Sequence, residues 1–119
     1  LMHTISLFLI YTIFKPMKLI VIDGTNHNLL GKRESLSTEL KHLKTSFQAS
    51  FKFQEIDLEY FQSNIEGALV TKIQEAGFDY DGIILNAAAY THTSIAIGDA
   101  VKAIETTVVE VHISNTFSR

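Results

Sequence analysis

Apolar positions along the chain form short continuous runs that alternate with segments of helical spacing. The continuous runs, which predict strands, are KLIVID (18–23), EIDLEYFQ (55–62), GIIL (82–85) and TVVEV (107–111). Apolar residues at every third or fourth position predict helices over 36–50, 64–76 and 94–104, the second ended by Gly77. This alternation is typical of an α/β fold with a parallel sheet and right-handed crossovers. The alternating run at 55–62 favours a place nearer the sheet edge.

The first sixteen residues differ in character from the rest. The run from Ile5 to Phe14 is nearly all apolar, but it is shorter than the ~20 residues that a membrane-spanning helix needs. It also lacks the basic start and the cleavage site of a signal peptide. Its β-branched and aromatic residues suit a strand that ends at Pro16. We therefore expect an apolar extension over 1–16 and a single domain over 17–119, with Met17 as the true start.

Composition narrows the classes of function. Hydrophobic residues make up 46% of the 119 and charged residues 19%, which permits one packed core. The formal net charge of −3 lacks the basic excess of a nucleic-acid binder. The absence of Cys removes disulfides, thiolate catalysis and Cys-based zinc sites, and it agrees with a reducing compartment. We therefore expect a cytoplasmic domain that binds neither nucleic acid nor membrane.

Polar residues follow each of the four predicted strands. The segments concerned are 24–34, 62–67, 86–94 and 110–115, in which Asn, His, Arg and Ser dominate. In an open parallel sheet the ligand lies at the carboxyl ends of the strands. These segments therefore predict a site for a small, oxygen-rich anion.

Each polar residue also has a purely structural interpretation. The loop from Gly24 to Gly31 carries no phosphate-binding glycine motif, so nucleotide binding is a weak alternative. The Asn residues at 26, 64 and 86 suit turns or caps, and His112, between Val111 and Ile113, suits a buried core position. A zinc site is conceivable, although no helical pair of ligands supports it. Its ligands would be His27, His92 and His112.

Four strings resemble the type II 3-dehydroquinate dehydratases. They are NHNLLGKRE, EYFQSNIEG, DGIILNAAAYTHTSIAIGDA and VVEVHISN, in this order. The resemblance implies a flavodoxin-like open parallel sheet with helices on both faces, of which this chain would lack the last strand and helix. It also implies anti elimination of water from 3-dehydroquinate through an enolate to give 3-dehydroshikimate, in the shikimate pathway or in quinate breakdown. No cofactor or metal and a trimer-based homo-oligomer are further implications.

The resemblance also implies roles for individual residues. His112 would be the general acid that protonates the departing hydroxyl group, and Glu110 would orient it. Asn26 would hold a water molecule near the enolate, and Arg33 would stabilise negative charge there. The substrate-binding residues would be Asn86 and His92 for hydroxyl groups, Asp99 in a neighbouring subunit's site, and Ile113 and Ser114 for the carboxylate.

The sequence departs from the family pattern where the base belongs. The family uses a tyrosine in the loop after the arginine, but this chain has no Tyr between Tyr11 and Tyr60. Ala88 stands where the family has glycine, which predicts strain in that loop. The strand at 107–111 would be an exposed apolar edge of the sheet. One hypothesis is that the run at 5–14 covers this edge by adding a strand to it.

These departures predict a dehydratase with reduced activity. The alternative is a catalytically dead family member that binds a cyclic hydroxy acid or joins intact subunits. A flavodoxin-like nucleotide or phosphate binder is a third hypothesis, supported by fold analogy alone.

Overall fold

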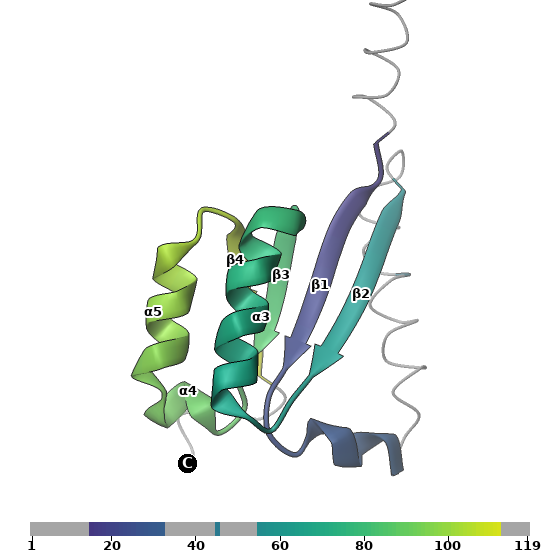
Figure 1. Cartoon of the computed structure of the whole chain (residues 1–119). Coiled ribbons are helices and arrows are strands. Elements are labelled where there is room, and N and C mark those ends of the chain that lie inside the picture. Colours follow the sequence, from purple (N-terminus) through teal and green to yellow (C-terminus); the bar gives the residue numbers. More distant parts are fainter. Residues whose placement is uncertain (1–14, 33–44, 46–54, 113–119) are drawn as a thin grey trace, which may run out of the picture.

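The computed structural model describes residues 15–32, 45 and 55–112. Its four strands are β1 (Met17–Asp23), β2 (Ile56–Gln62), β3 (Gly82–Asn86) and β4 (Thr107–Glu110). They form one parallel sheet in the order β2-β1-β3-β4 (Figure 1). This is the strand order of the flavodoxin-like doubly wound fold. The predicted α/β class and parallel sheet are confirmed, as is the edge position of β2.

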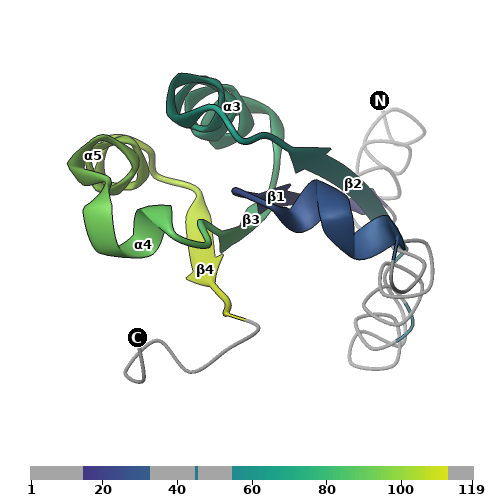
Figure 2. The same cartoon turned by 90° about the horizontal axis from the view of Figure 1, so that it is seen from below.

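Helices α3 (Glu66–Asp79) and α5 (Ile95–Ala103) lie side by side on one face of this sheet (Figure 2). The short helix α4 (Tyr90–Thr93) and the 3-10 helix η1 (His27–Lys32) follow β3 and β1 directly. The helix predicted over 36–50 for the other face lies outside the described residues, apart from Thr45, which is helical. Of the helices in the described ranges, none has the length and apolar character needed to cross a membrane.

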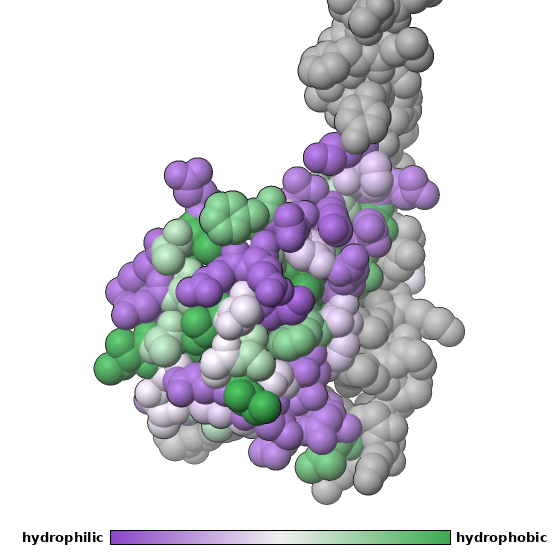
Figure 3. All heavy atoms as spheres, viewed as in Figure 1, coloured by the Kyte–Doolittle hydropathy of each residue, from purple (hydrophilic) through white to green (hydrophobic). Residues whose placement is uncertain are grey.

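The core lies between the sheet and the two long helices. Its fully buried large side chains are Ile22 of β1, Ile83 of β3, and Leu69 and Ile73 of α3. Burying one such side chain contributes about 1.5–3 kcal/mol relative to leaving it exposed. On the outer face of the helices, hydrophilic and hydrophobic side chains are interspersed (Figure 3). The core therefore fixes the central strands β1 and β3, whose carboxyl ends carry the polar segments.

The predicted end of the second helix at Gly77 is wrong, because α3 continues to Asp79. A Cβ atom at Gly77 would lie 2.4 Å from Cγ2 of Ile104, so this glycine permits close packing rather than ending the helix. The helix predicted over 94–104 is α5. It begins after Ser94, whose Oγ accepts a hydrogen bond from the backbone N–H of Ile97 at 3.0 Å. Serine is a favoured residue at this capping position.

Strand β4 forms the second edge of the described sheet, as predicted. It ends at Glu110, one residue before the predicted end, and Val109 and Val111 are exposed. The run at 5–14, considered as a cover for this edge, lies outside the described residues.

Candidate functional site at the carboxyl ends of the strands

The four strands all end at the same edge of the sheet, at the lower end in Figure 1. In the register of the sheet, Asp23 lies opposite both Gln62 and Asn86. Glu110 lies opposite Leu85, one residue before Asn86. The predicted convergence of polar groups from separate strands is therefore confirmed for the described residues.

The ends of β1 and β3 approach each other closely at Gly24. Its backbone N–H donates to the carbonyl oxygen of Asn86 at 2.8 Å. A Cβ atom at this position would lie 2.5 Å from the carbonyl oxygen of Ala87, a distance that real Cβ atoms essentially never show. Glycine is therefore required here, and it holds the side chains of Asp23 and Asn86 at one place.

A carboxylate, an imidazole and a phenol meet below the end of β1. Asp23 is only 7% exposed, and its Oδ2 accepts a hydrogen bond from the hydroxyl of Tyr60 at 2.8 Å. Its Oδ1 lies 3.1 Å from Nδ1 of His27, whose side chain is 13% exposed. A buried carboxylate is costly unless it is paired and hydrogen-bonded, and these two partners satisfy it.

Asn86 contacts the same imidazole from β3. It is 5% exposed, and its Oδ1 accepts from the backbone N–H of Ala88 at 3.3 Å. This contact directs the amide nitrogen toward His27, at 3.3 Å from Nδ1 and 3.5 Å from Nε2. Ala88 adopts a φ of 53°, which is left-handed backbone and agrees with the predicted strain at this former glycine position.

Asn64 ties the loop after β2 to the loop after β1. Its Oδ1 accepts from the backbone N–H of Asn26 at 3.0 Å and from Nε2 of Gln62 at 3.1 Å. Gln62 also donates to the carbonyl oxygen of Gly24 at 3.1 Å. Asn26 has a φ of 67°, a conformation that asparagine tolerates better than most residues. Asn64 therefore has the structural role in a turn that was considered for it. Asn26 is exposed at the edge of the site.

A second histidine–carboxylate pair follows β4. Nε2 of His112 lies 3.0 Å from Oε1 of Glu110, which also accepts from the hydroxyl of Thr91 at 3.1 Å. The His112 side chain is 25% exposed, so the core-histidine interpretation is wrong. Because a carboxylate fixes the orientation and tautomer of an imidazole, this geometry suits a proton donor.

An open cleft of about 350 Å³ lies between α5 and the β3–β4 pair. Its inner wall is apolar, with Leu85, Ala87 and Val108, and Thr91 and Glu110 lie on its rim. The cleft therefore adjoins the carboxylate of the His112 pair.

Five predicted site residues remain, of which two are described. His92 is exposed on α4 and Asp99 is exposed on α5. Arg33, Ile113 and Ser114 lie outside the described residues. Within the described ranges, no group of three or more His, Asp or Glu side chains is placed to hold a metal ion. The three histidines considered as zinc ligands are all described, and they do not form such a group.

The contact between Asp23, His27 and Tyr60 was not predicted. A signal was present: the spacing of four residues between Asp23 and His27 suits a helical turn. A turn at Thr25 and Asn26 leads from β1 into η1, which begins at His27.

Comparison with known proteins gives one family. The sequence model described as Dehydroquinase class II matches residues 17–119. Curated relatives include the 3-dehydroquinate dehydratase of Campylobacter lari, 49% identical over 106 residues, which cover 87% of this chain and 66% of that protein. The enzyme of the same name from Sulfurimonas denitrificans is 50% identical over 102 residues, covering 83% and 64%. The chain thus spans slightly less than two thirds of these two relatives.

Solved structures show the same likeness. The type II dehydroquinase of Propionibacterium acnes has a TM-score of 0.69 and 29% identity, covering 86% of this chain and 73% of that one. The corresponding protein of Butyrivibrio crossotus has a TM-score of 0.66 and 42% identity, covering 87% and 75%.

Proposed function

The chain belongs to the class II dehydroquinase family, and from this premise we propose that it removes water from 3-dehydroquinate to give 3-dehydroshikimate. It would then be a hydro-lyase of the shikimate pathway or of quinate breakdown. The observation that carries the proposal is the contact of 3.0 Å between His112 and Glu110 at the carboxyl end of β4. In this proposal the pair is an oriented proton donor at the end of β4, the strand that adjoins β3.

The chemistry explains why such a donor is needed. Removal of a proton next to the ketone makes an enolate, so the site requires a base and donors for the new oxyanion. Loss of the hydroxyl group then requires an acid, because hydroxide is a poor leaving group. In this proposal His112 supplies that proton, and Glu110 holds the ring in position.

The other roles in the proposal concern binding and charge. Asn26 and Arg33 act beside the enolate oxygen, the first through a bound water molecule. Asn86 and His92 bind substrate hydroxyl groups. The carboxylate is bound by Ile113 and Ser114, and Asp99 reaches the site of a neighbouring subunit in a trimer-based oligomer.

Three further predictions belong to the same proposal. The chain comprises an extension over 1–16 and a domain over 17–119, it acts in the cytoplasm, and it needs neither a cofactor nor a metal. The absence of Tyr between Tyr11 and Tyr60 favours one alternative, a family member that binds the substrate or joins other subunits without turnover.

The test is the rise in ultraviolet absorbance as the full chain converts 3-dehydroquinate to the conjugated product. We expect turnover that falls by about 10²–10⁴-fold in His112→Ala, the usual contribution of general acid–base catalysis. Glu110→Gln should also lower the rate, because the neutral amide orients the imidazole less well.

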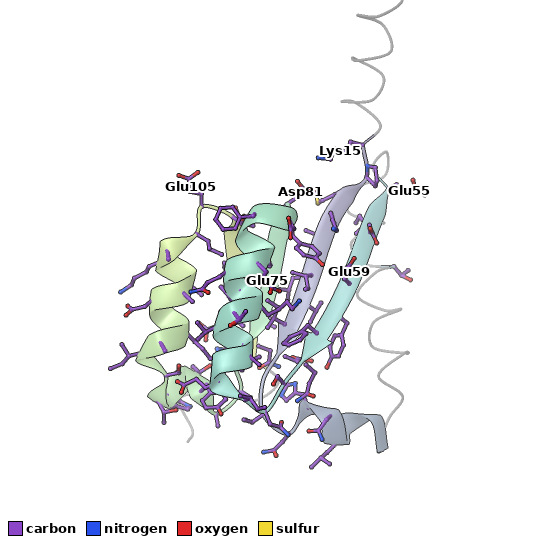
Figure 4. The ribbon with its side chains drawn as sticks, in the orientation of Figure 1. Lys15, Glu55, Glu59, Glu75, Asp81 and Glu105 are labelled. Carbon is purple, nitrogen blue, oxygen red and sulfur yellow. The ribbon has the colours of Figure 1, made fainter. Side chains whose placement is uncertain are left out.

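Glu105→Gln is the matched control, since this carboxylate lies at the opposite end of the sheet (Figure 4). It should leave the rate unchanged. No turnover by the folded wild-type chain would overturn the proposed dehydratase. Saturable binding of 3-dehydroquinate without turnover would then support the alternative.

A further inference from the structure

The contacts of His27 give it a function that the proposed mechanism leaves unassigned. We propose that His27, held by Asp23, is the general base that removes the proton next to the ketone. This inference rests on the proposed dehydration, which needs a base.

Asp23 determines which nitrogen of His27 carries the proton in the neutral ring. Its Oδ1 lies 3.1 Å from Nδ1, so in the neutral ring the proton resides on Nδ1 and is donated to the carboxylate. Nε2 then carries the electron pair, which faces the amide nitrogen of Asn86 at 3.5 Å. The carboxylate stays in contact with the ring when Nε2 accepts a proton.

Tyr60 and the surrounding burial keep this arrangement in place. The Tyr60 hydroxyl donates to the other oxygen of Asp23 at 2.8 Å, so both carboxylate oxygens have a partner. The carboxylate is therefore fixed by β1 on one side and by β2 on the other, and the imidazole has one favoured orientation. A base held in this way needs no movement of its own element to reach its working geometry.

Asn86 places the substrate within reach of Nε2 of His27. Its amide nitrogen lies 3.5 Å from Nε2 of His27, and the proposed function assigns Asn86 to a substrate hydroxyl group. In this proposal a hydroxyl group of the cyclic hydroxy ketone replaces His27 as the partner of the Asn86 amide, which brings the substrate ring beside His27 and leaves Nε2 to accept the proton. The His27 side chain keeps 13% exposure, enough for contact with a ligand but little enough to limit access of water.

The carboxylates that end β1 and β4 are already engaged. Asp23 already accepts from Tyr60 and pairs with His27. Glu110 accepts from Thr91 and pairs with His112. His112 serves as the acid in the proposed function. Among the side chains described at the strand ends, His27 thus combines a carboxylate partner, partial burial and contact with Asn86.

The two histidines divide the reaction between them. Nε2 of His27 takes the proton; the C–H electron pair becomes the C=C bond of the enolate, and the carbonyl pair moves to oxygen. When the enolate collapses, the C=O bond forms again and a C=C bond forms to the next carbon. The C–O bond breaks, and the hydroxyl group leaves as water with the proton from His112. His27 then releases its proton to solvent and His112 regains one.

The test compares two variants of the full chain in D₂O with 3-dehydroquinate. His27→Gln keeps a side chain that can donate to Asp23 but cannot accept the proton. We expect it to lose about 10²–10⁴-fold both in turnover and in deuterium incorporation at the carbon next to the ketone. His112→Ala should lose turnover but keep the incorporation, because it still forms the enolate.

A second variant separates a catalytic role from a structural one. His27→Ala should lose activity in the same way and regain part of it when imidazole is added, while Asn28→Ala, an exposed neighbour in η1, should behave as the wild type. Turnover by the wild type together with unchanged exchange in His27→Gln would overturn this inference and leave the proposed function standing. No turnover and no exchange by the wild type would overturn both.

Discussion

Gly24 joins the two central strands at the site, so a single methyl group there should be costly. In Gly24→Ala the new Cβ lies 2.5 Å from the carbonyl oxygen of Ala87 and 2.8 Å from its carbonyl carbon. Both atoms belong to the backbone, so no side-chain rotation relieves the contact. The ends of β1 and β3 must separate by about 0.9 Å to reach an ordinary contact distance.

The energetic cost follows from this displacement. Overpacking of a well-packed region costs about 1–3 kcal/mol, and here the 2.8 Å hydrogen bond from the Gly24 N–H to Asn86 is stretched as well. For a domain of this size each kcal/mol shifts the midpoint of thermal unfolding by roughly 4–8 °C. We therefore expect the midpoint to fall by roughly 5–20 °C.

The assay is thermal and urea unfolding followed by far-ultraviolet circular dichroism. Gly98→Ala is the matched control, because it makes the same change inside α5, where the new Cβ has no atom within 4 Å apart from the backbone of its own helix and its chain neighbours. It should raise the free energy of unfolding by about 0.5–1 kcal/mol, the advantage of Ala over Gly in a helix interior. If Gly24→Ala unfolds at the wild-type midpoint or above it, the close approach of the two strands is wrong.

Two further predictions concern the free energy of unfolding. The hydrogen bond from the Tyr80 hydroxyl to Glu59, together with burial and nearby carboxylates, raises the pKa of Tyr80 to about 12 from 10.0. Because the pKa of Tyr80 is higher in the folded state than in the unfolded state, this stabilisation is present below pH 10 and is lost as the pH rises toward 12. The free energy of unfolding, measured with urea across that pH range, should therefore decline less steeply in Tyr80→Phe than in the wild type. Equal declines in the two proteins would contradict the assignment. Ser94→Ala removes the cap of α5 and the hydroxyl that donates to Glu66, so the free energy of unfolding should fall by about 1 kcal/mol. An unchanged urea midpoint would show that the cap contributes nothing.

The strands could be predicted from the sequence because burial on both faces leaves a direct pattern. The central run from Leu19 to Asp23 is buried throughout, and nearly continuous apolar runs are typical of such strands. The four-residue helix α4 was missed, since one turn is too short to show periodicity. The end of α3 was predicted wrongly because Gly77 is needed for contact with Ile104, which is distant in the sequence.

The candidate site also has contacts that could be predicted from the sequence and contacts that could not. The pair formed by Glu110 and His112 was implied by the resemblance of VVEVHISN to the family. The contacts of His27 with Asp23 and Asn86 depend on η1 and on the pairing of β1 with β3. Neither the direction of a short 3-10 turn nor the distance between two side chains is encoded in a local pattern.

We propose that the carboxyl ends of the strands form the site for 3-dehydroquinate. Backbone amide shifts of the ¹⁵N-labelled full chain, measured as the compound is added, test it most directly. We predict saturable shifts at Gly24, His27, Asn86 and His112, and none at Asp81 or Glu105 at the opposite end of the sheet (Figure 4). Shifts confined to that opposite end, or no saturable shift at any concentration, would contradict the account.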